Sequence, residues 1–119
     1  ERAILNVIGP ILDPLLGPAA YGFRPGLGVK HAVREVARCR DEGLNWVLRA
    51  DVKDCFPSLD VVRIEGLLTK LIPDGEILAI ISLLNDRYAN KKGKRHAIPG
   101  LSQGSPLSPL FSNLALVES

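Results

Sequence analysis

Residues 49–60 read RADVKDCFPSLD and overlap a short stretch, 46–52, that is rich in β-forming side chains. We predict a strand over 46–52 that closes at Asp51 and leads into a turn. An aspartate in that position is held rigidly while its carboxylate still reaches a cleft, and hard cations such as Mg²⁺ prefer oxygen ligands of this kind. The alternative is that Asp51 only opens the turn, and Asp54 and Asp60 are interpreted more simply as a turn residue and a helix N-cap.

A second stretch, residues 100–110, reads GLSQGSPLSPL and combines small residues with the start of a helix. Small residues allow a ligand to approach the backbone closely, and the first turn of a helix offers free N–H groups. The loop could therefore cradle a nucleotide, although a simple capped turn has the same composition. We expect the helix to begin at Ser105-Pro106 or at Ser108-Pro109, because serine caps a helix and proline is tolerated in the first turn.

The rest of the chain has a mainly helical pattern. Apolar residues recur at helical spacing over 4–16, where two prolines should bend the helix. The segment 88–99 has a Lys-Lys-Gly-Lys-Arg centre and is interpreted as a β-hairpin with a basic tip or as a solvated loop. The expected fold is α/β, of the α+β kind, with mostly helices and a small antiparallel sheet. The other elements expected are an ordered loop over 17–28 and helices over 29–43, 61–71 (capped by Asp60) and 77–88 (capped by Asp74).

Composition narrows the class of protein. The chain has 119 residues, of which 46% are apolar, so we expect one domain over 1–119 with a genuine core. Apolar runs fall short of the roughly 18 residues of a membrane helix, and the two cysteines form no metal-like pair. We therefore expect a cytoplasmic protein with no membrane partner. Methionine is absent, even from position 1, which indicates part of a longer protein.

Residues 21–26, YGFRPG, complete a set of three separated motifs. With 51–56 (DVKDCF) and 103–110 (QGSPLSPL), they resemble, in order and spacing, the reverse transcriptases of group II introns, retrons and CRISPR-associated systems. The resemblance covers nearly the whole chain, and three motifs in order are far more specific than any one alone. It implies the fingers and N-terminal palm of a right-hand polymerase. Leu27 in place of a basic residue and Ser102 in place of proline depart from the pattern and leave the subfamily open.

The resemblance implies RNA-directed DNA polymerase activity, in which two Mg²⁺ ions assist phosphoryl transfer to a primer 3′-hydroxyl. Asp51 would bind both ions, and the Val52 carbonyl would bind the ion that accompanies the nucleotide phosphates. Phe56 would lie beneath the sugar and exclude a 2′-hydroxyl, with core packing as its alternative role. Gln103 and Gly104 would line the pocket for the incoming deoxynucleoside triphosphate.

The implied nucleic-acid partners are an RNA template and a DNA primer, bound mainly through their phosphates. The helix that begins at Pro106 would lie beside the template. Arg24 would shape the fingers and contact either the template or a neighbouring acidic group. A further candidate contact, with a solvated turn as an equal alternative, is the basic segment that contains Lys91, Lys92, Lys94 and Arg95.

The sequence stops at Ser119, before the Y-x-D-D hairpin of this family. One carboxylate cannot hold two ions about 4 Å apart, so we expect this chain alone to be inactive and its parent to be the enzyme. A palm sheet without the hairpin strands would have an exposed edge, through which a non-biological dimer could form. The alternative function is a non-catalytic, maturase-like scaffold that binds RNA.

Overall fold

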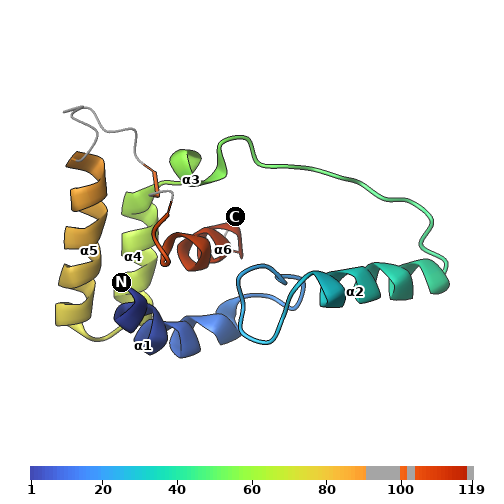
Figure 1. The fold of residues 1–119 in the computed structure, drawn as a ribbon, viewed down its shortest axis with the longest axis horizontal. Helices are drawn as coiled ribbons and strands as arrows, with labels where there is room; N and C mark the ends of the chain where they lie inside the picture. Colours follow the sequence, from blue (N-terminus) through green and yellow to red (C-terminus); the bar gives the residue numbers. More distant parts are fainter. Residues whose placement is uncertain (91–99, 102–103, 118–119) are drawn as a thin grey trace.

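The structure, a computed structural model, describes residues 1–90, 100–101 and 104–117. The described molecule is helical and elongated, measuring 51 × 30 × 21 Å. Most helices gather at one end, whereas α2 projects away from them (Figure 1). In chain order the elements are α1 (Arg2–Leu12), the 3-10 helix η1 (Asp13–Leu15), α2 (Val29–Asp41), α3 (Cys55–Ser58), α4 (Val61–Leu71), α5 (Gly75–Asn90) and α6 (Ser108–Val117).

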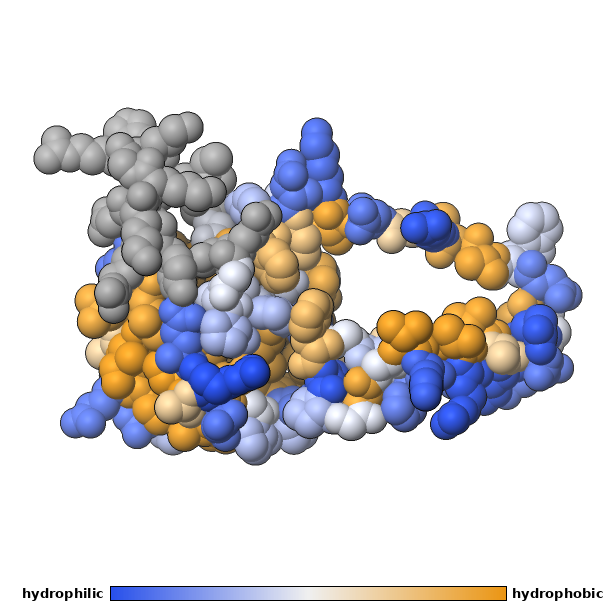
Figure 2. All heavy atoms as spheres, viewed as in Figure 1, coloured by the Kyte–Doolittle hydropathy of each residue, from blue (hydrophilic) through white to orange (hydrophobic). Residues whose placement is uncertain are grey.

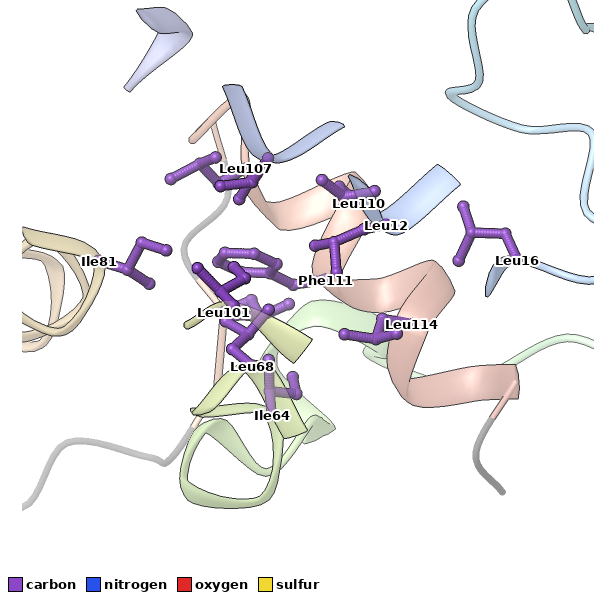
Figure 3. Packing of buried hydrophobic residues seen from close by; sticks show 12 residues of the cluster. Leu12, Leu16, Ile64, Leu68, Ile81, Leu101, Leu107, Leu110, Phe111 and Leu114 are labelled. Carbon is purple, nitrogen blue, oxygen red and sulfur yellow. The ribbon is translucent and has the colours of Figure 1, made fainter. Parts of the chain in front are cut away.

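One apolar core holds the helical end together. α4 packs against both α5 and α6, and α6 also packs against α3. Figure 3 shows the core with Phe111 of α6 at its centre, and this side chain is only 1% exposed. Burying a side chain of this size contributes about 1.5–3 kcal/mol. The buried members are Ile8, Leu12, Leu16, Ile64, Leu68, Ile72, Ile81, Leu101, Leu107, Leu110, Phe111 and Leu114.

Two aspartates start the central helices, as the sequence predicted. The Asp60 carboxylate accepts hydrogen bonds from the backbone N–H groups of Val62 (2.9 Å) and Arg63 (3.2 Å) at the start of α4. Asp74 accepts equivalent bonds from the first turn of α5, at 2.9 and 3.1 Å. Each carboxylate therefore satisfies N–H groups that have no partner within the helix.

The N-terminal helix changes from α to 3-10 geometry at its second proline. α1 continues through Pro10 and ends at Leu12, and Pro14 lies in the first turn of η1. Proline is tolerated there because the first N–H groups of a helix need no partner within it. Leu16 then becomes extended and starts the 17–28 loop. The helix predicted over 4–16 is therefore found as α1 followed by η1, and Pro10 does not interrupt it.

The predicted strand and antiparallel sheet are wrong. Residues 44–52 are extended without regular structure, and the described ranges 1–90, 100–101 and 104–117 contain no strand. Trp46, Val47 and Leu48 are 97%, 83% and 93% exposed. Their side chains favour an extended backbone, but a strand also needs a neighbour to pair with, and no described backbone group bonds to residues 45–52. The fold is helical rather than α/β in the described part, which also lacks the sheet edge expected to mediate a dimer.

The helix predicted over 29–43 is confirmed as α2, with Gly43 just past its end in a left-handed conformation (φ +91°). Its apolar side chains are nevertheless exposed to solvent: Val29, Val33 and Val36 are 80%, 61% and 62% exposed. Figure 2 shows apolar side chains on α2 facing those of the extended segment across open space. Periodicity therefore predicted the element correctly without predicting its burial.

The segment predicted as a β-hairpin is partly helical. α5 extends to Asn90, and residues 91–99 lie outside the described part of the chain. Among the described helices, none is both long enough and apolar enough to cross a bilayer.

Removal of the Asp60 cap should weaken α4. We expect Asp60→Ala to lower the free energy of unfolding by about 1 kcal/mol, because two N–H groups lose their acceptor. Asp60→Asn should lose much less, since asparagine also caps helices. Urea unfolding of the two variants measures the difference, and equal losses would contradict a capping role.

Candidate functional site

One pocket of about 440 Å³ lies where the start of α1, the 17–28 loop, α3 and the residues that begin α6 meet. Its volume is within the range of sites for small organic ligands. Among the described lining residues, Arg2 alone carries a formal charge, and the others are aromatic, proline or small. These walls suit a ligand that has a flat apolar part and an anionic part. The lining residues are Arg2, Phe23, Phe56, Gly104, Ser105, Pro106, Ser108 and Pro109.

One wall is the turn that precedes α6. Gly104 has φ +96°, a conformation that glycine adopts without strain. The Ser105 Oγ accepts a hydrogen bond from the Leu107 N–H (3.2 Å), and the Ser105 carbonyl accepts one from the Ser108 N–H (3.3 Å). Of the two expected helix starts, Ser108 begins the helix and Ser105 closes the turn before it. This hydrogen bonding fixes the backbone of the wall.

Phe56 forms a second wall from the short helix α3, which the sequence predicted as a turn. α3 follows Asp54, whose φ of +50° is left-handed, a conformation that aspartate tolerates better than most residues. The Leu101 N–H donates to the Phe56 carbonyl (2.7 Å), and the Cys55 Sγ lies 3.4 Å from the Ser112 Oγ. Phe56 both packs against the core and lines the pocket, so these two roles are compatible.

Phe23 forms the third wall, and Arg24 organises the loop that carries it. The Arg24 guanidinium makes two hydrogen bonds to the Asp13 carboxylate, at 2.9 and 3.1 Å. Its remaining N–H groups donate to four backbone carbonyls, so all five donors are engaged. Phe23 itself has φ +57° and is 77% exposed. The four carbonyls belong to Asp13 (3.1 Å), Leu16 (3.3 Å), Gly17 (3.0 Å) and Ala20 (3.1 Å).

A second contact fixes the same loop to the core. The Asn113 Nδ2 on α6 donates to the Gly22 carbonyl (2.8 Å), 91 residues away in sequence. Phe23 is therefore presented by a backbone that is held on both sides, by Arg24 and by Asn113. An exposed aromatic side chain on such a backbone is suited to ligand contact, because little order is lost on binding.

The pairing of Arg24 with Asp13 also changes their acidities. The hydrogen bonds from Arg24 hold the pKa of the Asp13 carboxyl below its usual range, and partial burial opposes this only weakly. The pKa of the Arg24 guanidinium is raised by the same hydrogen bonds. Arg24 is 11% exposed and Asp13 is 32% exposed, so the pair is shielded more than a typical surface ion pair.

Asp51 and Val52 lie in the extended segment before α3, and both are exposed. No described residue bonds to the Asp51 carboxylate, so both of its oxygens are free for a ligand. Carboxylate and carbonyl oxygens are the donors that Mg²⁺ prefers. Within residues 1–90, 100–101 and 104–117, however, no three His, Cys, Asp or Glu side chains are grouped closely enough to hold a metal. The described residues thus offer oxygen donors at 51 and 52 but form no complete metal site.

The pocket unites three of the predicted site residues, namely Phe56, Gly104 and Pro106. Asp51 does not line it. The predictions for Gln103 and for the basic segment at 91–95 concern residues outside the described part of the chain. For Arg24, the structure places an acidic neighbour, Asp13, against the guanidinium.

Two pocket residues had no predicted role. Phe23 belongs to the YGFRPG motif, and its aromatic side chain next to Arg24 was the signal that could have found it. Arg2 has no local signal, because it is an ordinary helix residue in sequence. It reaches the pocket only because the start of α1 lies beside the residues that begin α6.

Each of the three motifs contributes a described residue to the same pocket: Phe23 from 21–26, Phe56 from 51–56 and Gly104 from 103–110. The motifs therefore contribute to one pocket built from segments that are separated in the sequence. The family described as "Reverse transcriptase (RNA-dependent DNA polymerase)" matches residues 1–119, and the chain belongs to this family.

Curated relatives agree with this assignment. The chain is 32% identical over 117 residues to the "Uncharacterized 91 kDa protein in cob intron" of Schizosaccharomyces pombe. This match covers 98% of the chain and 14% of the yeast protein. The chain is 29% identical over 119 residues to the "Group II intron-encoded protein LtrA" of Lactococcus lactis subsp. cremoris, covering 99% of this chain and 20% of LtrA. The "Retron Mx65 reverse transcriptase" of Myxococcus xanthus is 31% identical over 111 residues. The match covers 87% of this chain and 25% of the retron protein. The chain thus spans a quarter or less of these three proteins, and no solved structure matches it.

The Asp13–Arg24 pair should make stability depend on pH. Because the pKa of Asp13 is lower in the folded state than in the unfolded state, its contribution is present above the unfolded pKa and is lost as pH falls through the folded pKa. We expect the urea midpoint to fall as pH drops from about 5 to about 3, and Asp13→Asn to reduce this slope. Asp86→Asn, at an exposed position with no ion pair to a described residue, is the control and should keep the slope. Equal slopes in the wild type and Asp13→Asn would contradict the role of the pair.

Proposed function

We propose that this chain forms the nucleotide-pocket region of an RNA-directed DNA polymerase that adds deoxynucleotides to a primer 3′-hydroxyl. The single observation that carries the proposal is the meeting of Phe23, Phe56 and Gly104 on one pocket, because these residues come from the three motifs of the family. Three turns without a common function would not be expected to line the same pocket.

The chemistry of the walls supports a nucleoside triphosphate as the ligand. Phe56 offers a flat apolar face to a sugar, and the backbone at Gly104 can be approached closely because it carries no side chain. Arg2 offers a guanidinium to the phosphates, which pair well with such a fork of donors. Gln103 is proposed to complete the pocket beside Gly104.

We propose that Asp51 and the Val52 carbonyl hold Mg²⁺. Support comes from the unpaired and exposed carboxylate of Asp51 and from the oxygen donors of both residues. When bound, Mg²⁺ offsets the negative charge that develops on the transferred phosphoryl group. Two ions about 4 Å apart need more carboxylates than Asp51 alone, so the rest of the protein must supply them.

Contacts to the RNA template and DNA primer are proposed for the surface around Pro106, which lines the pocket, and for the basic segment at 91–95, which lies outside the described residues. Such contacts to phosphate should weaken as salt rises. Arg24 has all five donors engaged within the protein, so we propose that it supports the template region through the loop it holds.

Primer extension on an RNA template tests the proposed activity. We expect Asp51→Asn, in the full-length protein that contains this chain, to lower the rate by at least about a thousandfold, as the loss of a metal ligand removes several kcal/mol of transition-state stabilisation. Asp54→Asn is the matched control, since asparagine also tolerates the left-handed conformation at position 54. We expect its rate to stay within a few-fold of the wild type.

An inactive wild-type protein that still binds RNA in a salt-sensitive way would overturn the proposal. It would favour the alternative of a non-catalytic, maturase-like scaffold. Equal activity of Asp51→Asn and the wild type would reject only the metal-binding role of Asp51.

The proposed role of Phe56 predicts a loss of sugar discrimination. We expect Phe56→Ala to lower the ratio of deoxynucleotide to ribonucleotide incorporation by about 10- to 100-fold, because the space for a 2′-hydroxyl opens. Phe56→Leu should have a smaller effect. Single-nucleotide incorporation with a dNTP and its matching rNTP measures the ratio, and an unchanged ratio in Phe56→Ala would leave Phe56 only its core-packing role.

A further inference from the structure

Gly100 lies in closer contact with the chain than the other described glycines do. A Cβ at position 100 would come within 2.4 Å of the Pro57 carbonyl oxygen and within 2.6 Å of its carbonyl carbon and Cα. No other described glycine has any atom within 4 Å of such a Cβ. Since the neighbours of Gly100 are backbone atoms, they cannot move aside as a flexible side chain could. Glycine is therefore required here for space.

The close contact is made with the helix that carries Phe56. Pro57 follows Phe56 in α3, and the residue after Gly100 donates its N–H to the Phe56 carbonyl (2.7 Å). That residue, Leu101, is 5% exposed and belongs to the core. α3 therefore makes a close contact with a segment that is anchored in the core through Leu101.

Another lining residue of the pocket follows this segment closely in the sequence. Gly104 lies four residues after Gly100 and lines the pocket together with Phe56. The place of the Phe56 wall therefore depends on how closely residue 100 approaches α3. An added methyl group must push the two segments apart, because contacts this short do not occur between real atoms.

We propose that Gly100 is a positioning residue that sets the place of Phe56 in the nucleotide pocket and thereby the discrimination between deoxyribose and ribose. The inference rests on the proposed polymerase function. Gly100 touches no nucleotide itself, since it is absent from the pocket lining. It acts through Pro57 and the Leu101–Phe56 hydrogen bond.

The test uses the full-length protein and compares incorporation of a dNTP with that of the matching rNTP. We expect Gly100→Ala to lower the dNTP:rNTP ratio of kcat/KM by roughly tenfold or more, because displacements near 1 Å at a reacting site have effects of this size or larger. The loss for the dNTP should appear mainly as a higher KM. Because both substrates meet the same enzyme sample, a smaller folded fraction lowers both rates equally and leaves the ratio unchanged.

Gly66→Ala is the matched control. Gly66 lies on the exposed side of α4, and a Cβ there would meet nothing within 4 Å. The control should keep both the ratio and the KM of the wild type.

A double-mutant cycle tests whether Gly100 acts through Phe56. In a Phe56→Ala background, Gly100→Ala should change the ratio by less than about twofold, because the side chain that it displaces is gone. An equally large change in both backgrounds would overturn the proposal, as would an unchanged ratio in Gly100→Ala alone. If Gly100→Ala does not fold, Leu101→Ala replaces it, since loss of this buried side chain loosens the same segment and should lower the ratio in the same direction. An unchanged ratio in that variant would also overturn the proposal.

The outcomes separate this inference from the function on which it rests. Absence of any incorporation by the wild-type protein overturns the polymerase function and the inference together. An active wild-type protein whose Gly100→Ala variant behaves like Gly66→Ala overturns only the role of Gly100.

Discussion

Burial of α6 is the constraint on which the other parts of this structure depend. Phe111 lies at the centre of the core, and the same helix is tied to α3 through Ser112 and to the 17–28 loop through Asn113. The turn that begins α6 is also a wall of the pocket. Because hydrophobic burial holds α6 in place, the walls that contact it are held relative to one another. The shape of the pocket therefore depends on the packing of the core, which is dense and resists deformation.

Two of the charged residues of the motifs, Arg24 and Asp51, contribute in opposite ways. Arg24 has every N–H donor engaged by Asp13 and by nearby carbonyls, so its charge is used to fold a loop that has little apolar surface of its own. Asp51 has no partner among the described residues, so its carboxylate remains available. A charge with satisfied hydrogen bonds stabilises local structure, whereas an exposed, unpaired carboxylate can accept a cation. The structure therefore separates a scaffolding residue from a candidate ligand, although both stand in short motifs of the same family.

Much of the candidate site was predictable because its residues lie in motifs of unusual composition. Phe56, Gly104 and Pro106 were selected from the sequence, and all three line the pocket. Arg2 could not be found in this way, since nothing in its own surroundings marks it. Its place depends on packing between segments about 100 residues apart, which local patterns do not record. The contact between Gly100 and Pro57 is of the same kind, because a glycine needed for space has no sequence signature that distinguishes it from a glycine needed for a turn.

The sequence by itself determined the longer helices, the two aspartate caps and the family. Apolar periodicity and capping aspartates act within one or two turns of the chain, so Asp60 and Asp74 could be assigned without tertiary information. Tertiary structure alone decided that residues 46–52 form no strand and which residues line the pocket. β-forming side chains such as Trp46 favour an extended backbone, but a sheet forms only where a second strand supplies hydrogen bonds, and the described residues supply none. Local structure follows from local interactions, whereas strand pairing and the meeting of separated walls require partners that are distant in the sequence.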